Sequence, residues 1–452
     1  MLNKFNNFEK DNLQLLKKEK LWTFMRVKVY YELLAKSSKT THSSKNLNTK
    51  INYIFSFFYG FTNFFKKYDF YFFSDSGQRK KINGKYVDKL TDPIIKYLNP
   101  NRCLQFELPS PQLYKKKNIE TKNVISQTTI EIFSYVLAKI YVTIKKNRNT
   151  IYEYINKELD LNINYNFYSV FFNIRYSLFK FLFKIMKPKA IFVVCYYDKA
   201  YIVKAAKDLN IIVVELQHGI IGKVHPAYYS NILLNNSYIP DYLLSFGLYE
   251  KEIVSQKNGI YNLNQIHPIG HYYIEYLYNN FTLNKNLTKQ IKNYDLIFSV
   301  TLQDSITDKL LDIIEELAEA YQNYLFIIIP REELERYRTQ NFKNIILFNE
   351  LDCYQKTLHS DFHITAYSSC AIEAPSLGVK NILFNINNFS RNYFDGLLSE
   401  DNTVIVDSVE EFDRWINLYS SYNSIEVVDS NKYLIQTLYA KNIKVFIEGL
   451  EI

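Results

Sequence analysis

Short apolar runs alternate with amphipathic segments from residue 189 onward. The runs are rich in β-branched residues and too short for helices, so they predict buried strands. They span residues 190–195, 211–215, 242–246 and 265–268. Residues 199–208 and 249–256 have apolar positions at helical spacing and predict helices between these strands. Strands that alternate with helices favour a parallel sheet with helices on both faces.

A second alternating series follows a charged, Asn-rich stretch at residues 279–293. Its predicted strands span residues 296–301, 325–329, 344–348, 361–365, 381–384 and 404–406. Its predicted helices span residues 308–321, 352–358, 369–377 and 409–419. The pattern predicts two doubly wound domains, at residues 1–285 and 286–420, and a helical tail at residues 421–452 that crosses back to the first domain.

The part of the chain before residue 189 is less regular. It predicts a helix within residues 13–34, a strand at residues 70–74 and a long helix over residues 126–156. Residues 166–186 predict a further helix, with aromatic residues on one side and lysines towards its end. This helix suits either a membrane interface, where aromatic rings and lysines gather, or a protein core with a polar face.

The net charge of +9 is divided unevenly along the chain. Residues 1–200 carry a charge of +20, and residues 201–452 carry −11. A basic front part indicates an anionic partner, such as membrane phospholipid, a phosphate-linked lipid carrier or nucleic acid. The 40 tyrosines and 33 phenylalanines are spread over the whole chain, and no nucleic-acid-binding motif accompanies them. We therefore expect no nucleic-acid partner.

The cysteines and the hydropathy indicate the compartment. The four cysteines are widely spaced and form no pair or His/Cys cluster of the kind that binds metal. The amino terminus has no apolar stretch of signal-peptide length, and no run of about 18 uncharged apolar residues occurs. We expect a cytoplasmic protein without a metal ion or bound cofactor.

Polar residues follow three of the predicted strands directly. Glu215, Gln217 and His218 come at the end of the strand at residues 211–215, and Asp198 follows the strand before it. In open α/β sheets, ligands bind at the carboxyl ends of the strands. A histidine there can accept a proton near neutral pH. Asp75 and Arg79 follow the strand at residues 70–74 and indicate a further cleft edge, or else a solvated loop.

The second domain has its own polar stretch after the strand at residues 361–365. Ser368 and Ser369 stand at the start of the next predicted helix, where hydroxyls and backbone N–H groups bind phosphate. Glu373 lies one turn further, where a carboxylate can accept hydrogen bonds from two ribose hydroxyls. The alternative is that the serines only cap the helix and Glu373 is a surface charge.

At these residues the sequence resembles the GT-B glycosyltransferases. The run from Ser368 to Phe384, Ser-Ser-Cys-Ala-Ile-Glu-Ala-Pro-Ser-Leu-Gly-Val-Lys-Asn-Ile-Leu-Phe, is similar to the donor-binding stretch of that family. Residues 266–271, Ile-His-Pro-Ile-Gly-His, resemble the segment that enters the interdomain linker. The resemblance covers residues 189–417. It implies an α/β protein of two Rossmann-like domains that face a cleft, with a nucleotide sugar bound mainly to the second domain.

The step Gln217-His218-Gly219 is similar to the His-Gly step of bacterial surface-polysaccharide transferases. These include polysialyltransferase, capsular Kdo-transferase and glycerophosphotransferase-like groups. Those groups often carry a His-Pro in the second domain that contacts the donor phosphate, whereas this chain has Pro330-Arg331-Glu332 at the matching place. A guanidinium pairs well with phosphate, so Arg331 is the candidate for that role. The donor nucleotide stays open between CMP, UDP and GDP.

The resemblance implies an inverting, metal-independent glycosyltransferase that adds a sugar to a growing capsule or lipopolysaccharide glycan. It would work in the cytoplasm, peripherally at the inner face of the membrane, on a glycan or lipid-linked acceptor. His218 is the candidate base, with Glu215 or Asp198 to orient or replace it. The candidate donor-binding residues are Ser368, Ser369, Glu373, Arg331 and Thr301. The candidate acceptor-binding residues are Gln217, His225, Tyr228, Arg79 and Asp75, with an ordinary loop as the alternative for the segment that carries His225 and Tyr228.

Two other classes of function stay open. A polyol-phosphate transferase or a sugar-nucleotide epimerase on the same fold would use a similar donor site. A nucleic-acid-binding module or an inactive scaffold is the remote alternative.

Overall fold

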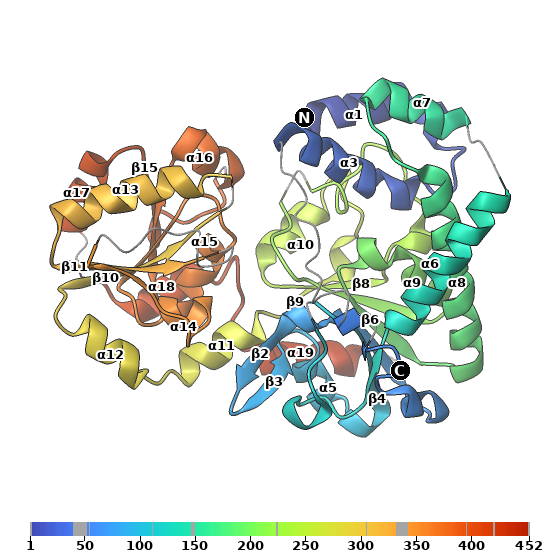
Figure 1. Ribbon diagram of the computed structural model, residues 1–452, viewed down its shortest axis with the longest axis horizontal. Helices are drawn as coiled ribbons and strands as arrows, with labels where there is room; N and C mark the ends of the chain where they lie inside the picture. The colour runs from blue at the N-terminus through green and yellow to red at the C-terminus, as the bar shows by residue number, and fades with distance from the viewer. Residues whose placement is uncertain are drawn as a thin grey trace. The chain divides into compact units, whose positions relative to one another are not determined.

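A computed structural model describes residues 2–38, 52–53, 55–110, 112–145, 150–222, 225–303, 305–330, 342–394, 396–418 and 421–450. The chain forms two compact units (Figure 1). Unit 1 comprises Met1–Ser245, Glu250–Pro268 and Lys441–Ile452, and unit 2 comprises Phe246–Tyr249 and Ile269–Ala440. The division after Pro268 comes earlier than the expected boundary at residue 285.

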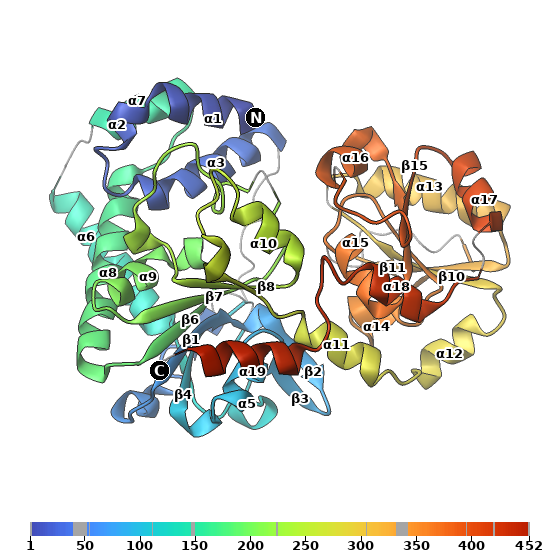
Figure 2. The same cartoon turned by 180° about the vertical axis from the view of Figure 1, so that it is seen from behind.

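Unit 1 contains a seven-stranded sheet in the order β5-β4-β1-β6-β7-β8-β9, and every pairing is parallel (Figures 1 and 2). The strands are β1 (Phe70–Asp75), β4 (Cys103–Leu108), β5 (Val124–Ser126), β6 (Ala190–Val194), β7 (Ile212–Leu216), β8 (Tyr242–Ser245) and β9 (Ile266–Pro268). The chain builds outward from β1 in one direction, returns, and continues from β6 in the other. This reversal is the mark of a doubly wound sheet.

A two-stranded antiparallel hairpin and a set of helices complete unit 1. The hairpin consists of β2 (Arg79–Ile82) and β3 (Lys85–Asp88). The helices that lie wholly in unit 1 are α1 (Leu2–Asp11), α2 (Leu13–Leu16), α3 (Trp22–Ser38), α5 (Asp92–Tyr97), α6 (Thr128–Ile144), α7 (Thr150–Leu159), α8 (Tyr165–Met186) and α9 (Ala200–Lys207). Two more helices belong partly to unit 1. Helix α10 (Leu248–Val254) begins in unit 2, and helix α19 (Tyr439–Gly449) belongs to unit 1 from Lys441 onward. The predicted single helix over residues 126–156 is wrong, because α6 and α7 are separate.

The burial of α8 decides whether it is a membrane-interface helix or a core helix. Phe172, Phe179 and Phe183 are buried, and Phe179 and Phe183 pack against the ring of Phe73 in β1. Helix α8 is therefore a core helix. None of the described helices is long and apolar enough to cross a membrane.

Unit 2 contains a six-stranded sheet in the order β12-β11-β10-β13-β14-β15, and its pairings are also all parallel. The strands are β10 (Leu296–Thr301), β11 (Tyr324–Ile329), β12 (Ile345–Leu347), β13 (Phe362–Thr365), β14 (Lys380–Phe384) and β15 (Thr403–Val406). The helices are α11 (Tyr272–Asn279), α12 (Lys285–Ile291), α13 (Thr307–Ala320), α14 (Cys353–Thr357), α15 (Cys370–Glu373), α16 (Phe389–Phe394), α17 (Val409–Leu418) and α18 (Ser424–Ser430). The order reverses between β10 and β13, so this sheet is doubly wound as well.

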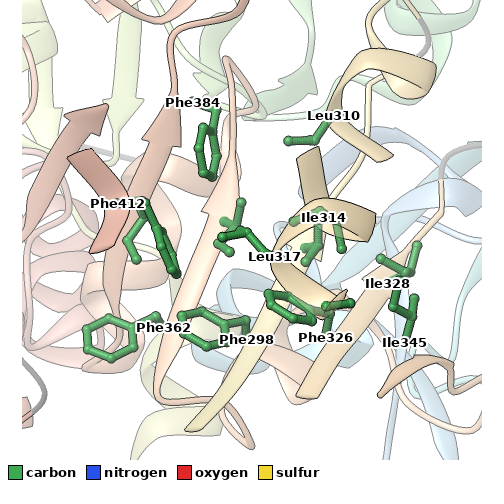
Figure 3. Packing of buried hydrophobic residues seen from close by; sticks show 14 of the residues in the cluster. Phe298, Leu310, Ile314, Leu317, Phe326, Ile328, Ile345, Phe362, Phe384 and Phe412 are labelled. Atoms are coloured by element: carbon green, nitrogen blue, oxygen red, sulfur yellow. The ribbon is translucent and has the colours of Figure 1, made fainter. Parts of the chain in front are cut away.

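The core of unit 2 is built mainly on one face of this sheet (Figure 3). Leu310, Ile314 and Leu317 of α13 and Phe412 of α17 pack onto alternate residues of the strands, among them Phe298. The opposite face is covered by a smaller cluster around Leu287 of α12. Burial on both faces explains why these strands are almost continuously apolar in the sequence.

The predicted fold class is confirmed: the chain is an α/β protein with two doubly wound parallel sheets. The strands predicted from residue 189 onward are all present, with shifts of one residue at some ends. The sequence did not predict β2 to β5 or helix α1.

Candidate functional site

The topology singles out one place on the sheet of unit 2. Strands β10 and β13 are neighbours, and the chain leaves them towards opposite edges of the sheet. Ligands of doubly wound sheets bind beyond the carboxyl ends of such a strand pair. In unit 2 these ends are Thr301 and Thr365, so the segments that follow them form the candidate site.

Gln303, just beyond β10, is the polar side chain that best fits a ligand contact there. It is 7% exposed, and its Oε1 accepts hydrogen bonds from the backbone N–H of Tyr367 (3.3 Å) and from Thr365 Oγ1 (3.4 Å). Its Nε2 is buried and has no hydrogen-bond partner among the described residues. A buried donor without a partner is costly in a folded protein, and a bound ligand that accepts from it would remove that cost.

The predicted serines lie on the β13 side of this site. Ser368 is buried, and its Oγ accepts a hydrogen bond from the N–H of Cys370 (3.3 Å). Ser369 is half-buried and makes no side-chain capping bond at the start of α15. Its hydroxyl is therefore the better candidate of the two for a ligand contact.

The helix predicted over residues 369–377 is shorter than expected. An α-helix covers only Cys370–Glu373, and a 3₁₀-helix follows over Ala374–Leu377. Pro375 has no N–H to donate to the carbonyl of Ala371, and that carbonyl instead accepts from Asn381 Nδ2 (2.7 Å). Four residues of α-helix give little dipole, so phosphate binding here would depend on side chains and local N–H groups rather than on a long helix.

Glu373 is almost completely buried. Its Oε1 accepts a hydrogen bond from the Tyr354 hydroxyl (3.0 Å), and burial raises the pKa of that tyrosine well above its usual value. This bond uses one of the acceptor sites of the carboxylate, and Oε2 is the oxygen with more capacity for the predicted ribose contact. Arg331, the predicted phosphate ligand, lies outside the described residues.

Thr301 belongs to a hydrogen-bonded chain inside the sheet. Its Oγ1 is 2.9 Å from His363 Nε2, and His363 Nδ1 is 2.8 Å from Asn381 Oδ1. Asn381 Nδ2 donates to Ala371 O, so Asn381 Oδ1 must accept and the imidazole proton is on Nδ1. Burial lowers the pKa of His363 to about 4. The structure thus gives Thr301 a structural role in place of the predicted donor contact.

Unit 1 has the same reversal between β1 and β6, and a pocket of about 530 Å³ lies at their carboxyl ends. Its lining combines three carboxylates, two cations, two phenols, a hydroxyl and two apolar side chains. These are Asp75, Glu131, Asp198, Arg175, Lys199, Tyr53, Tyr201, Ser110, Leu108 and Pro109. Carboxylates, hydroxyls and aromatic faces together suit the hydroxyls and apolar faces of a sugar.

The cations of this pocket are held in fixed positions. Lys199 is buried and its Nζ donates to the carbonyl of Val194 at the end of β6 (2.8 Å). The Arg175 guanidinium lies 3.9 Å from the ring centroids of both Phe171 and Tyr201 and pairs with Glu131 (3.3 Å). Two held cations beside three carboxylates make the pocket polar without a large net charge.

Asp198 is brought to the pocket by an unusual turn. Cys195, directly after β6, has a φ of +60°, in the left-handed region that a residue with a side chain seldom adopts. Its Sγ donates to Asp198 Oδ2 (3.2 Å), and the Asp198 side chain is otherwise exposed. Residues held in such strained conformations gather at functional sites. Asp75 lines the same pocket, and burial raises the pKa of its carboxyl.

His218 follows β7 and is half-buried. Its Nε2 is 3.5 Å from the hydroxyl of Tyr197, and its Nδ1 is buried without a partner among the described residues. Burial, with the nearby charge of Lys199, lowers the pKa of His218 to about 4. The ring of His225 also lies against Tyr197, with the ring centroids 5.4 Å apart, and burial lowers the pKa of His225 to about 4 as well. Both imidazoles are therefore neutral at pH 7, and neither lines the 530 Å³ pocket.

Glu215 is fully buried and does not orient His218. Its carboxylate accepts hydrogen bonds from the hydroxyls of Tyr228 (2.7 Å) and Tyr261 (2.9 Å) and from the N–H of Tyr196 (3.3 Å). Burial raises the pKa of Glu215 to about 7. The predicted catalytic role of Glu215 and the acceptor role of Tyr228 are therefore replaced by a shared structural role.

Gln217, the residue directly after β7, is also buried and hydrogen-bonded within the fold. It is 1% exposed, and its Nε2 donates to the carbonyl of Gly219 (2.9 Å) and to Glu250 Oε1 (2.7 Å). These bonds fix the turn after the strand. Gln217 is therefore not open to an acceptor, contrary to the prediction.

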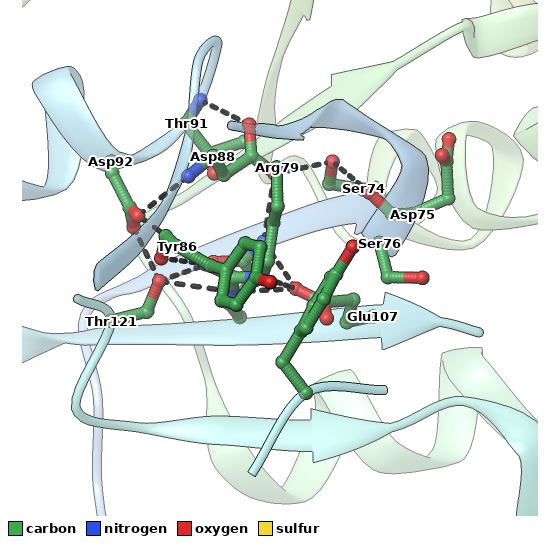
Figure 4. Close-up of polar contacts among 12 residues, drawn as sticks. Ser74, Asp75, Ser76, Arg79, Tyr86, Asp88, Thr91, Asp92, Glu107 and Thr121 are labelled. Atoms are coloured by element: carbon green, nitrogen blue, oxygen red, sulfur yellow. Dashed lines mark hydrogen bonds and ion pairs between the residues drawn. The ribbon is translucent and has the colours of Figure 1, made fainter. Parts of the chain in front are cut away.

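Arg79 is enclosed in a buried ion network (Figure 4). Its Nε donates to Glu107 Oε2 (2.8 Å), and its terminal nitrogens contact Asp92 (3.4 Å) and Thr121 (3.1 Å). Burial raises the pKa of Glu107 to about 7 and that of Asp92 to about 6. Arg79 thus holds β2 against β4, and it is not the acceptor ligand that the sequence predicted.

Of the residues that line the unit 1 pocket, the sequence predicted only Asp75 and Asp198, and it did not predict Gln303 in unit 2. Lys199 and Gln303 each follow a predicted strand closely, so the rule that identified Asp198 could have found them. Glu131, Arg175 and Tyr201 lie within helices, and their meeting depends on how α6, α8 and α9 pack. Among the described residues, no group of three or more His, Cys, Asp or Glu side chains could hold a metal ion.

Comparison with known proteins supports the fold. No family model and no curated protein matches the sequence. A putative UDP-N-acetylglucosamine 2-epimerase from Listeria monocytogenes has a TM-score of 0.55 and 11% identity, over 84% of this chain and 95% of that chain. The UDP-GlcNAc 2-epimerase from Neisseria meningitidis, bound to UDP-GlcNAc, has a TM-score of 0.54 and 12% identity, over 84% and 99%. The glycosyltransferase SnogD from Streptomyces nogalater has a TM-score of 0.49 and 9% identity, over 84% and 100%.

These similarities extend over most of both chains in each case. At such low identity the similarity to the two epimerase structures establishes a shared GT-B-like fold and not a shared reaction.

Proposed function

We propose that the protein binds a nucleotide sugar at the carboxyl edge of the unit 2 sheet and transfers its sugar to an acceptor hydroxyl. The observation that carries this proposal is the polar site at the reversal point of each of the two doubly wound sheets. In unit 2, the unpartnered Nε2 of Gln303 and the open hydroxyl of Ser369 would contact the nucleotide sugar. Glu373 would accept from the ribose with its second oxygen.

The acceptor sugar would occupy the 530 Å³ pocket of unit 1. Its hydroxyl oxygen would attack the anomeric carbon while the bond from that carbon to the donor phosphate breaks. The nucleotide would leave with the bonding electron pair, and a base would take the hydroxyl proton. Asp198 is the better placed base, because its carboxylate lines the pocket whereas His218 does not. Asp75 would hold a second hydroxyl of the acceptor.

The class of transferase and its place in the cell are inferred from the family resemblance at residues 217–219 and 368–384. On this inference the protein is an inverting, metal-independent transferase of capsule or lipopolysaccharide synthesis, which works in the cytoplasm at the inner face of the membrane.

Epimerisation of the nucleotide sugar is the second candidate reaction. Two of the similar structures are described as UDP-GlcNAc 2-epimerases, and one holds UDP-GlcNAc. An epimerase needs no second substrate, whereas transfer does, and the polar pocket of unit 1 offers a place for one.

Product analysis separates the two reactions. Purified protein would be incubated with UDP-GlcNAc, and with CMP- and GDP-sugars, in the presence and absence of short glycan acceptors, and the products followed by NMR. Transfer predicts acceptor-dependent release of the free nucleotide and a new glycosidic linkage. A change of sugar configuration without an acceptor would establish epimerisation, and no turnover of any donor would contradict both.

A further inference from the structure

Helix α6 has its large apolar residues on the outside. Its outward side carries six exposed residues, which we name the α6 apolar face: Phe133, Val136, Leu137, Ile140, Tyr141 and Ile144. The residues of α6 that are buried are Thr128, Ser134 and Ala138, all small. A surface helix of a globular protein normally has the opposite arrangement, with its apolar stripe towards the core. The described residues leave this face uncovered, with Ile144 78% exposed.

The apolar surface continues beyond the start of α6. Ser56 Oγ is 2.8 Å from Thr128 Oγ1, and Thr129 Oγ1 donates to the carbonyl of Phe57, so residues 55–65 lie against the first turn of the helix. This segment exposes four further phenylalanines: Phe55, Phe58, Phe61 and Phe65. Large apolar side chains exposed together on two adjoining segments indicate an interaction site.

The charges beside this surface are almost all positive. Lys139 and Lys145 are exposed on α6, and Lys66 and Lys67 are exposed at the end of the phenylalanine segment. Within residues 55–67 and 128–145 the one acidic residue is Glu131, which pairs with Arg175 on α8. Aromatic and aliphatic side chains flanked by lysines match the interface of an anionic lipid bilayer.

A second copy of the chain fits this surface less well. In a two-fold dimer the same patch meets itself, so the lysines would face like charges without acidic partners on this face. An anionic membrane instead supplies both the apolar medium and the opposite charge. We propose that the α6 apolar face, with Phe55, Phe58, Phe61 and Phe65, is the surface through which the protein docks on an anionic lipid bilayer. The proposal is independent of the reaction that the protein catalyses.

Vesicle co-sedimentation of the full-length protein tests this docking surface. We expect the protein to bind phosphatidylcholine vesicles that contain phosphatidylglycerol about tenfold more tightly than vesicles of phosphatidylcholine alone, and less tightly at high salt. The double variant Ile140→Gln with Ile144→Gln should lose about tenfold in vesicle affinity. The double variant Lys139→Gln with Lys145→Gln should lose mainly the preference for the anionic lipid.

The matched control is Val445→Gln, which changes an apolar side chain of α19 that is 63% exposed and should leave vesicle binding unchanged. Circular dichroism and light scattering would establish that each variant is folded and report its oligomeric state. Equal vesicle binding by wild type and the Ile140/Ile144 variant would overturn the proposal. So would a wild-type dimer that does not bind vesicles and that the same two substitutions dissociate. Vesicle binding without turnover of any sugar donor would leave the docking surface standing and contradict only the proposed reaction.

Discussion

Replacing Asp198 by asparagine is expected to lower the turnover of glycosyl transfer by about 10²- to 10⁴-fold, the usual contribution of a general base. The amide keeps the size of the side chain but cannot take the acceptor proton. Because Asp198 belongs to the pocket of unit 1, the affinity for the nucleotide sugar should stay within about twofold. Steady-state kinetics with varied donor and acceptor would measure both quantities.

Two further variants make this test specific. Asp208→Asn changes a carboxylate at the end of α9 that pairs with Lys204, outside the pocket, and should leave turnover unchanged. His218→Ala should lower turnover by less than Asp198→Asn, because His218 does not line the pocket. If His218→Ala instead caused the loss of about 10²- to 10⁴-fold and Asp198→Asn did not, the base would be His218.

Replacing Arg79 by alanine is expected to destabilise unit 1 by about 3–5 kcal/mol. The side chains of Arg79, Glu107 and Asp92 are almost completely excluded from solvent. Removal of the guanidinium leaves two buried carboxyls without their cation, and burial already raises the pKa of both. Urea denaturation followed by circular dichroism would measure the change in the free energy of unfolding.

The surface pair between Arg102 and Asp69 provides the control, because both side chains are about half exposed. Arg102→Ala should cost less than about 1 kcal/mol. The double variant Arg79→Met with Glu107→Leu should be more stable than Arg79→Ala, since it removes one of the unpaired charges. A loss below about 1 kcal/mol for Arg79→Ala would show that the network does not stabilise the fold.

The two sheets could be predicted because their strands are buried on both faces. Such strands appear in the sequence as short apolar runs, for example in β6 and β7, and their alternation with helices gives the parallel order. Strand β4 was missed because its Gln105 and Glu107 face the buried network of Arg79. A polar strand face normally indicates solvent, and only the structure shows that this one is internal.

The sequence indicated where the candidate sites lie, but it identified only some of the residues that the structure places there. The rule that ligands lie at the carboxyl ends of strands pointed to Asp75, Asp198 and Ser369, which the structure places in the candidate sites. It could not tell an open side chain from one that is bonded within the fold, as Glu215 and Gln217 are. The sequence pattern also could not show which of the two aromatic helices, α6 or α8, has an exposed apolar side. Helix α8 turned out to be a core helix, whereas α6, read simply as a helix, carries the uncovered apolar face.

The proposed reaction depends on the binding of a nucleotide sugar at the reversal point of the unit 2 sheet. Isothermal titration of the wild type with UDP-, CMP- and GDP-sugars, repeated with Gln303→Leu and Ser369→Ala, tests it most directly. We expect one class of nucleotide sugar to bind the wild type and each substitution to weaken binding by about tenfold, the loss expected for one hydrogen bond to a ligand. Absence of binding for every donor, or full affinity in both folded variants, would contradict it.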